Sequence, residues 1–519
     1  MLNFWVKDYV RGDFGSAQDK KRNHNRIRRL YDLSVKDQYN IDDQTWNDLE
    51  MDDIFTGIDR TYSSAGEGAL YRMLRTPEMD KEILEEREKI ITEFSNNLDL
   101  TTKIRIILFN MGFDRKNVLL DMITQELVIN KKKYYIYTLL GKILPIVWVL
   151  GAIIFAEPRL IILLMVNLFI NIYFSQKEET IVRAKGLVYL KSLFTAAEKI
   201  SKIKNDNIKS YTEIISEQLS ELKKIERGLT LIKFVKAFGE LLDLFTMPLL
   251  LHETTYYNVS GNIKGNENKI FNLINTIGEV DALIGIASFT TSNKEKICKP
   301  EFTEGVSLDI KEGFHPLVQD AVPNSIKIDK KGMVLTGTNM SGKSTFLRMI
   351  GSNILFAQTF NFAFAKSYKG SFFNVVTSIS PKDDILNGKS YYMAEATSLL
   401  RVINSMNDDI PVFCAIDEIF RGTNPIERIA SSIEILKYII NRNSVSIVTT
   451  HDYELTELLK GIYDFYYFSE EVDDKTGLKF DYKLKRGTSK SRNAIKLLEY
   501  IGYPKEITEG ALKRAENNC

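Results

Sequence analysis

The sequence predicts a fold in two parts, a mainly α-helical domain followed by an α/β domain with a largely parallel sheet. Three observations predict it. Apolar residues recur at helical spacing through charged segments between residues 41 and 298. From residue 299 onward, short β-rich runs such as "GMVLTG" and "VFCAID" alternate with helical segments, which is typical of an α/β domain. An apolar block at 143–174 predicts a hydrophobic helical hairpin inside the helical domain.

The composition is that of a folded protein, with 519 residues of which 44% are hydrophobic and 26% are charged. The 69 basic and 68 acidic residues nearly cancel, so any contact with nucleic acid or membrane needs a local patch. The three cysteines lie far apart and predict neither a metal site nor a disulfide framework, which fits a reducing compartment. The first residues contain no apolar run of the kind found in secretory signals.

Residues 1–40 form a basic leader that contains the stretch "KKRNHNRIRR". Two interpretations remain open for it: a solvated helix face or arm, or an electrostatic contact with phosphates or anionic lipid. The basic residues concerned are Lys20, Lys21, Arg22, Arg26, Arg28 and Arg29.

The stretch "GTNMSGKS" at 337–344 matches the phosphate-loop pattern G-x-x-x-x-G-K-[ST]. It follows the apolar run "MVLT" and opens a helical segment, as the pattern requires. Gly337 and Gly342 allow the backbone to turn so that its N–H groups point at phosphates. Lys343 is expected to reach the β- and γ-phosphates, and the Ser344 hydroxyl to hold Mg²⁺. The pattern therefore predicts a site for a nucleoside triphosphate with Mg²⁺.

Two further strands are expected to end at this site. "VFCAIDEI" places Asp417, a candidate metal ligand, and Glu418, a candidate for positioning or deprotonating the attacking water, at a strand end. "SIVTTHDYEL" places His451 at the end of another, within reach of the γ-phosphate. The predicted catalytic residues are Glu418 and His451, the predicted metal ligands are Ser344 and Asp417, and the predicted reaction is Mg²⁺-dependent hydrolysis of a nucleoside triphosphate.

Four stretches together resemble the ATPase domain of the MutS family, a branch of the ABC-type ATPases associated with DNA mismatch repair. They are "TGTNMSGKST", "DDILNGKSYYMAEA", "DEIFRGTNPIE" and "TTHDYEL". The resemblance implies that 299–519 is an α/β P-loop ATPase domain of the ABC type with a C-terminal helical dimerisation tail. It implies a MutS-like core or lever domain at 41–298, ATP and Mg²⁺ as cofactors, a homodimer, and mismatched or irregular DNA as partner.

The resemblance also assigns nucleotide-binding residues. Gln358 falls where the family has its Q-loop, and Gly388 and Ser390 fall in the signature loop that contacts the γ-phosphate of the opposite subunit. The complete set is Gly337, Thr338, Asn339, Met340, Ser341, Gly342, Lys343, Ser344, Thr345, Gln358, Gly388 and Ser390.

The sequence departs from the family pattern in two places. The leader at 1–40 is too short for the family's N-terminal mismatch-reading domain and contains no Phe-x-Glu motif, so a shortened member without that domain is expected. No aromatic residue that could stack on adenine occurs between "HPLV" and the phosphate loop.

The apolar block consists of two runs, 143–156 and 160–174, separated by the turn-forming "AEPR". It lies where the family carries a DNA clamp at the tip of its lever. One interpretation is a hairpin buried in the core. The other, which we favour because a lever tip offers little to bury it, is a membrane hairpin that starts at residue 134. Lysines on both sides of the block favour a cytoplasmic location for both of its ends.

Two functions follow. The first is a dimeric MutS-family protein that binds DNA and binds and hydrolyses ATP. The alternative is a membrane-anchored mechanochemical ATPase of the ABC type, with a protein or membrane partner and no mismatch recognition. In both, the ATPase domain is expected in the cytoplasm, and in the alternative the cytoplasmic membrane holds the hairpin.

Overall fold

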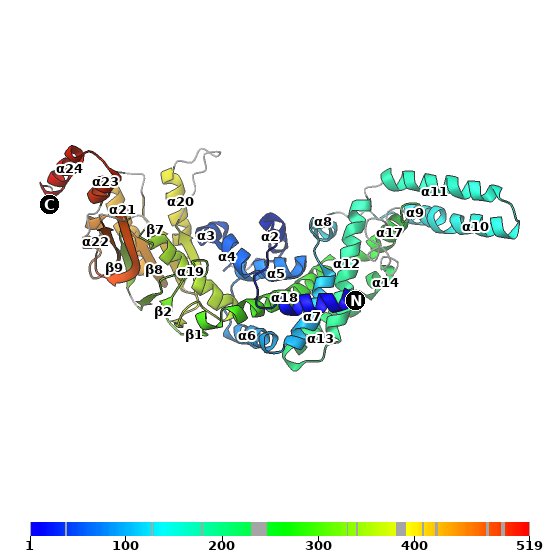
Figure 1. The fold of residues 1–519 in the computed structure, drawn as a ribbon, viewed down its shortest axis with the longest axis horizontal. Coiled ribbons are helices and arrows are strands. Elements are labelled where there is room, and N and C mark those ends of the chain that lie inside the picture. Colours follow the sequence, from blue (N-terminus) through cyan, green and yellow to red (C-terminus); the bar gives the residue numbers. More distant parts are fainter. Residues whose placement is uncertain are drawn as a thin grey trace. The chain divides into compact units, whose positions relative to one another are not determined.

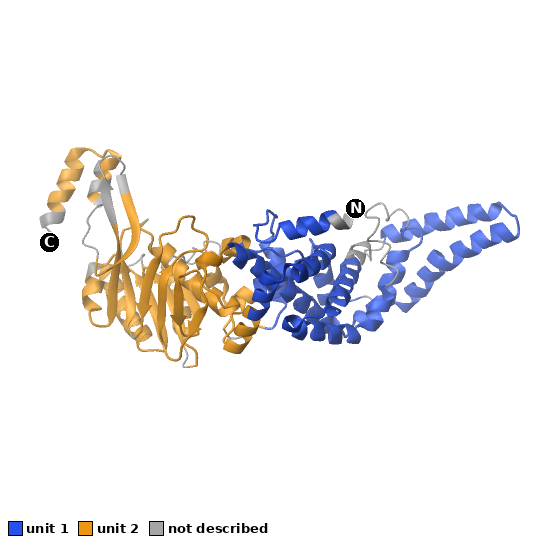
Figure 2. Ribbon diagram, turned by 60° about the horizontal axis from the view of Figure 1, so that its bottom comes forward, with its two compact units in different colours: residues 1–35, 58–72, 89–292 blue, residues 36–57, 73–88, 293–519 orange. Residues whose placement is uncertain are grey.

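The fold was obtained as a computed structural model (Figure 1). It describes residues 2–36, 39–125, 127, 129–177, 180–229, 246–329, 331–338, 341–379, 391–406, 409–420, 424–473, 477–488 and 494–517. The chain divides into two compact units (Figure 2). Unit 1 comprises residues 1–35, 58–72 and 89–292, and unit 2 comprises residues 36–57, 73–88 and 293–519.

The division differs from the expected boundaries in two short segments. Residues 36–57 and 73–88 belong to unit 2, although the sequence pattern assigned them to the helical domain. The first segment contains Trp46, Leu49 and Phe55, whose side chains are fully buried. Its helix α3 (Asp43–Asp48) packs against a strand of unit 2. Burial of these large side chains is what attaches the segment to the α/β unit.

Within the described residues of unit 1, the regular secondary structure consists of helices. Helix α18 forms its core, since Ile270, Ile277 and Ile284 recur at helical spacing and are buried. The helices are α1 (Leu2–Gly12), α2 (His24–Asp32), most of α5 (Ser64–Arg75), part of α6 (Lys81–Asn96), α7 (Leu98–Met111), α8 (Val118–Thr124), α9 (Lys131–Thr138), the π-helix η1 (Leu139–Ile143), α10 (Leu144–Ile154), α11 (Arg159–Lys177), α12 (Thr180–Ser201), the 3-10 helix η2 (Asp206–Ile208), α13 (Lys209–Glu221), α14 (Lys223–Gly228), α17 (Leu251–Ile263) and α18 (Glu267–Ser292).

Three basic residues of the leader form ion pairs inside unit 1. Lys20 Nζ lies 2.7 Å from Asp59 Oδ2, and Arg22 Nε lies 2.9 Å from the same oxygen. Arg26 pairs with Glu67, whose side chain is almost fully buried. Burial by itself would raise the pKa of Asp59, but Lys20 and Arg22 hold it below its usual value. These three residues therefore fit neither interpretation of the leader, because buried carboxylates fix them.

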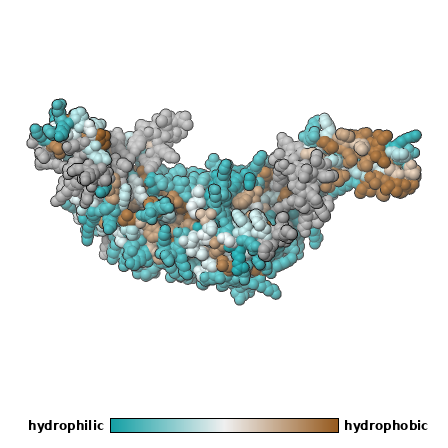
Figure 3. All heavy atoms as spheres, viewed as in Figure 1, coloured by the Kyte–Doolittle hydropathy of each residue, from teal (hydrophilic) through white to brown (hydrophobic). Residues whose placement is uncertain are grey.

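The apolar block forms two long helices that pack against each other (Figure 1). The first runs continuously through α9, η1 and α10, and the second is α11, with residues 155–158 between them. Among the described residues, three helices are long and apolar enough, by length and composition, to cross a membrane: Lys131–Ile154, Arg159–Lys177 and Glu267–Ser292. The apolar windows of the first two are each 17% buried, whereas that of the third, within α18, is 72% buried. Figure 3 shows hydrophobic atoms gathered over α10 and α11.

Unit 2 contains two sheets. The larger has the order β10-β9-β4-β8-β7-β6, in which β10 is antiparallel to β9 and the other neighbours are parallel. Its strands are β4 (Gly332–Thr336), β6 (Asn374–Ser378), β7 (Val412–Asp417), β8 (Ser444–Thr449), β9 (Tyr463–Asp473) and β10 (Gly477–Arg486). The smaller sheet has the order β1-β5-β2-β3, with β1 (Pro300–Phe302), β2 (Leu308–Gly313), β3 (Asn324–Ile328) and β5 (Ser367–Gly370).

The helices of unit 2 surround these sheets. They are α3, α4 (Met51–Ile58), the ends of α5 and α6, the 3-10 helix η5 (Lys294–Lys296), α19 (Lys343–Phe360), α20 (Tyr391–Asn404), α21 (Pro425–Ile440), α22 (Tyr453–Leu458), α23 (Ala494–Ile501) and α24 (Lys505–Asn517). Strands β4, β6, β7 and β8 are buried along their whole length, as expected for continuous apolar runs in a parallel sheet. The α/β character predicted for this region is confirmed.

The strand register brings the predicted site residues to one edge of the larger sheet. Thr449, the last residue of β8, is paired with Leu335 of β4 on one side and with Asp417 of β7 on the other. The carboxyl ends of these three parallel strands therefore lie side by side, where ligand sites of such sheets occur.

Candidate functional site

The loop after β4 has the backbone geometry of an anion-binding turn. Gly337 and Gly342 have φ values of 147° and 100°, which favour glycine, and α19 begins directly after the second of them. The first N–H groups of this long helix have no partner within the helix and point toward the loop. Asn339 and Met340, also predicted to bind nucleotide, lie outside the described residues.

Lys343 fixes a positive charge at this loop. Its side chain is buried, and Nζ donates hydrogen bonds to the carbonyl oxygens of Gly337 and Thr338, both at 2.8 Å. Nζ also lies 3.4 Å from Nε2 of His451. A buried ammonium whose neighbours are a glycine loop and a helix N-terminus is suited to holding phosphate oxygens.

Ser344 and Asp417 form a pair of oxygen ligands. Ser344 Oγ donates to Asp417 Oδ2 at 2.7 Å, and the hydroxyl of Thr449 donates to the other carboxylate oxygen. No cluster of three or more His, Cys, Asp or Glu residues that could hold a metal ion occurs in the described parts of the chain. One carboxylate and one hydroxyl suit Mg²⁺, which usually keeps several waters and shares phosphate oxygens with its substrate.

Glu418 and His451 contact each other beside this pair. Glu418 Oε1 lies 2.9 Å from His451 Nε2, so the imidazole stands between a carboxylate and the Lys343 ammonium. The backbone of Glu418 has φ 61°, and its N–H donates to the carbonyl oxygen of Thr449 at 3.2 Å. A non-glycine residue in this region of φ costs energy and persists where the surroundings fix it, often at functional sites.

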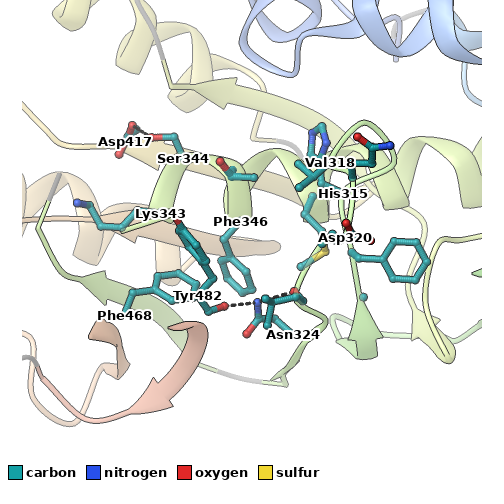
Figure 4. Close-up of a pocket in the computed structure, with 18 of the residues that line it drawn as sticks. His315, Val318, Asp320, Asn324, Lys343, Ser344, Phe346, Asp417, Phe468 and Tyr482 are labelled. Carbon is teal, nitrogen blue, oxygen red and sulfur yellow. Dashed lines mark hydrogen bonds between the residues drawn. The ribbon is translucent and has the colours of Figure 1, made fainter. Parts of the chain in front are cut away.

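The end of the phosphate loop and the acidic pair Asp417-Glu418 border a cavity of about 850 Å³, within the range of sites for cofactor-sized ligands (Figure 4). One end is polar, with Lys343, Ser344, Asp417 and Glu418. The other end is lined largely by apolar and aromatic side chains, namely Phe314, Val318, Val322, Phe346, Met349, Phe468 and Tyr482. His315 also lines the cavity, and burial, helped by Arg348, lowers its pKa to about 4, so it is neutral at pH 7. Asp320 lies among the lining residues as well, so the cavity combines a polar end at the phosphate loop with a largely apolar remainder.

Tyr482 is a cavity residue that the sequence pattern did not reveal. It lies at an irregularity of β10 with φ 52°. Asn324 holds it there by donating to the Tyr482 carbonyl at 2.9 Å and accepting from the N–H of Leu484 at 2.7 Å (Figure 4). A Cβ atom on Gly342 would lie 3.3 Å from the tyrosine ring. A strand far along the chain thus places an aromatic ring in the cavity.

Gln358, which was predicted to bind nucleotide, does not line this cavity. Gln358 lies near the far end of α19, where its side-chain amide both donates to and accepts from the backbone of Phe373 at 2.9 Å. It is buried and is not among the cavity-lining residues. Gly388 and Ser390 lie outside the described residues.

Asp48 in α3 is a second position that the sequence did not single out. Its buried carboxylate accepts hydrogen bonds from the Thr377 hydroxyl and the Ile379 N–H, both at 2.9 Å. Its carbonyl oxygen accepts from Arg348 Nε of α19 at 2.8 Å. Asp48 thus joins the helix that follows the phosphate loop to the end of β6, directly before the segment that contains the predicted signature loop.

A parallel sheet whose central strand leads through a glycine loop into a helix, beside an acidic pair on a nearby strand, defines an α/β domain of the nucleotide-binding class. Residues 333–517 match the family model "MutS domain V", the C-terminal ATPase domain of that family. Over these residues the chain is similar to the MutS family.

Proteins with similar sequences are also named MutS. The DNA mismatch repair protein MutS of Fusobacterium nucleatum is 32% identical over 263 residues, which are 49% of this chain and 29% of that protein. The MutS protein of Aquifex pyrophilus is 33% identical over 257 residues, 47% of this chain and 29% of the relative. That of Clostridium kluyveri is 26% identical over 366 residues, 64% and 41% respectively. The chain therefore spans well under half the length of the curated relatives it matches.

Proposed function

We propose that this chain binds ATP with Mg²⁺ and hydrolyses it to ADP and phosphate. The observation that carries the proposal is the convergence of three sets of groups at one end of a single cavity. These are the Lys343 ammonium in its loop, the Ser344–Asp417 oxygen pair, and the Glu418–His451 contact. Their spacing fits the parts that phosphoryl transfer requires, namely phosphate binding, metal binding and positioning of a water.

Each group has a distinct role in this proposal. The loop N–H groups and Lys343 hold the triphosphate. Ser344 and Asp417 hold Mg²⁺, which neutralises charge on the phosphates when bound. Glu418 positions the attacking water or accepts its proton, while His451, held by Glu418, contacts the γ-phosphate. Tyr482 stacks on the base in the largely apolar part of the cavity.

The test is phosphate release by the purified full chain with ATP and Mg²⁺. Lys343→Ala is expected to lose ATP binding and turnover together. Lys369→Ala is the matched control, because Lys369 is an exposed lysine of the same unit that pairs only with Glu301 on the smaller sheet. Turnover by Lys343→Ala at the rate of the control would contradict the proposal.

The proposal extends to a homodimer that acts on mismatched or irregular DNA. Its support is the match of residues 333–517 to MutS domain V and the names of the relatives, which are DNA mismatch repair proteins. Gly388 and Ser390 would complete the site of the opposite subunit. Glu418→Gln is expected to bind ATP without hydrolysing it and so to accumulate as a closed dimer, which light scattering would detect. If this variant stays monomeric at saturating ATP, sites shared between subunits are ruled out.

A second candidate function is a membrane-anchored mechanochemical ATPase whose partner is a protein or a membrane. The observation that favours it is the large apolar surface left exposed on α10 and α11. Its ATPase domain would lie in the cytoplasm. The two functions differ in what accelerates turnover. Stimulation by mismatched duplex over matched duplex supports the first, and indifference to every DNA structure together with stimulation by vesicles supports the second.

A further inference from the structure

The α10–α11 pair, defined by residues 139–177, has its polar side chains inside and its apolar side chains outside. Asn167, Asn171 and Ser175 recur every four residues on α11, so they share one side of the helix, and all three are buried. Ile154 and Phe169 are each 71% exposed. A helix pair that folds in water has the opposite arrangement.

Two of the inward polar side chains, Asn171 and Ser175, donate hydrogen bonds within unit 1, whereas the buried Oδ1 atoms of Asn167 and Asn171 accept none from the described residues. Asn171 Nδ2 donates to the carbonyl oxygen of Leu140 at 2.9 Å and to that of Pro248 at 2.7 Å. Leu140 lies in the π-helical turn η1, where the wider spacing disturbs the usual α-helical hydrogen bonds. Ser175 Oγ donates to Glu253 Oε1 of α17 at 2.6 Å. Such internal pairing is what a hydrocarbon environment demands, because it offers polar groups no water.

The exposed apolar residues surround the pair rather than forming one patch. On α10 and the residues beside it they are Ile143, Ile146, Val147, Val149, Leu150, Ile153, Ile154 and Phe155, and on α11 they are Ile161, Ile162, Leu163, Met165, Val166, Phe169, Ile170 and Tyr173. At 3.6 residues per turn, each set covers roughly half of its helix, the half that does not face the other helix. A folded protein partner covers one side of such a pair, whereas lipid covers every side.

The dimensions and the ends of the pair also fit a bilayer. Lys131–Ile154 has 24 residues and α11 has 19, which correspond to about 36 and 28 Å of helix against a hydrocarbon thickness of about 30 Å. Exposed Lys131, Lys132 and Lys177 lie at the base, with Tyr135 and Tyr173 nearby. The connection at the other end contains Arg159, whose side chain is 88% exposed and lies 3.4 Å from Glu157. Charges at both ends bracket the apolar band.

We propose that the α10–α11 pair inserts into a lipid bilayer as a helical hairpin, with its base on one side of the membrane and residues 155–158 reaching the other. This rests on the second candidate function and names its partner as the lipid rather than a protein. Insertion requires no nucleotide, so it succeeds or fails separately from ATP hydrolysis.

The test is flotation of the full chain with vesicles of neutral phosphatidylcholine in high salt, which removes attachment by charge alone. The wild-type chain is expected to float with the vesicles and to stay with them after an alkaline wash. The double variant Ile154→Glu, Phe169→Glu places two carboxylates in the apolar band and is expected to reduce the floating fraction at least tenfold. Both positions are exposed, so the variant is expected to keep its fold, checked by circular dichroism.

The matched control is Ile214→Glu, which changes an apolar residue on α13 that is 45% exposed and lies outside the pair. It is expected to float like the wild-type chain. Equal flotation of the double variant and the wild-type chain would overturn the proposal. The proposal would also be overturned if the wild-type chain stayed in solution as an oligomer and the double variant were a monomer. A second copy of the chain would then cover the pair.

Discussion

Asp417 of unit 2 and Asp281 of unit 1 are both buried carboxylates that accept a hydrogen bond from a serine hydroxyl, at 2.7 and 2.6 Å. Asp417 stands at a strand end and lines a cavity. Asp281 stands inside the helix core, where it also accepts from the Tyr62 N–H at 3.1 Å. A Cβ atom on Gly66 would lie 2.2 Å from its oxygen, so the backbone closes over it. Under the proposed function, the same pair of groups binds a ligand in one place and stabilises the fold in the other.

The two carboxylates differ in whether a ligand can reach them rather than in residue type. A carboxylate at the edge of a parallel sheet faces a space that a metal ion and phosphates can enter. A carboxylate enclosed by helices has only its fixed neighbours, and burial raises the pKa of Asp281 to about 6. Four predictions test this contrast, from the largest expected effect to the smallest.

Asp417→Ala is expected to lower ATP turnover by at least about 100-fold, because a metal-binding carboxylate contributes several kcal/mol to the stabilisation of charge in the reaction. Its effect on thermal unfolding should be much smaller than its effect on turnover. Steady-state phosphate release at saturating Mg²⁺ measures it. Full activity in this variant would show that Asp417 serves the fold, as Asp281 does.

Asp281→Ala is expected to lower the free energy of unfolding by about 2 kcal/mol, because it leaves the Ser63 hydroxyl and the Tyr62 N–H buried without their acceptor. Urea unfolding followed by circular dichroism measures it. Asp329→Ala is the control, since Asp329 is an exposed aspartate whose partner is Lys327 at 3.3 Å. The two variants would have equal stabilities if Asp281 were not structural.

The raised pKa of Asp281 predicts a pH dependence of stability. Its folded pKa of about 6 exceeds the ordinary value of 3.8, so the folded state binds the proton more tightly than the unfolded state. The stabilisation is complete below the unfolded pKa and is lost as pH rises through about 6. Lys20 and Asp59 also act on this carboxylate, and both are retained in the Asn variant.

The quantity to measure is the stability difference between the wild-type chain and Asp281→Asn at a series of pH values. It is expected to shift against the wild-type chain by on the order of 2 kcal/mol between pH 4 and pH 7. A difference that does not vary with pH would mean that Asp281 has an ordinary pKa.

Tyr482→Ala is expected to weaken ATP binding about tenfold, the loss of one stacked aromatic ring, and Tyr482→Phe to retain it. Titration with a fluorescent ATP analogue measures both. Inorganic triphosphate, which has no base, serves as the control ligand and should bind the wild-type chain and the Ala variant equally. Equal loss for both ligands would show that the tyrosine supports the loop rather than the base.

The strands, loop and helix around the candidate site can be predicted from the sequence because these parts are local. The glycines of the loop, the strand before it and the helix after it lie within one short stretch, and the short apolar runs identify β4, β6, β7 and β8 in order. Tyr482 escaped prediction because its place depends on the pairing of β9 with β10 and on a contact with distant Asn324. Asp48 was not predicted either, because its place depends on contacts with Arg348, Thr377 and Ile379, which are distant in sequence.

The leader shows another limit. Its cations form an obvious run, but the carboxylates that hold them, Asp59 and Glu67, are visible as partners only once the chain is folded. The apolar block is the reverse case, since its helices follow from composition while the inward direction of Asn167, Asn171 and Ser175 does not. A hydrophobic pattern indicates that a surface is shielded from water, but it does not indicate whether protein or lipid shields it.

The π-helical turn η1 affects how insertions and deletions during evolution would alter the structure. It holds one residue more than an α-helical turn needs, which rotates everything beyond it by about 100° about the helix axis. Deleting one residue there, Lys142 for example, would restore an unbroken α-helix and swing α10 through more than a quarter turn. The side that α10 presents is therefore set by a residue count, which a single insertion or deletion alters in one step and which point substitutions leave untouched.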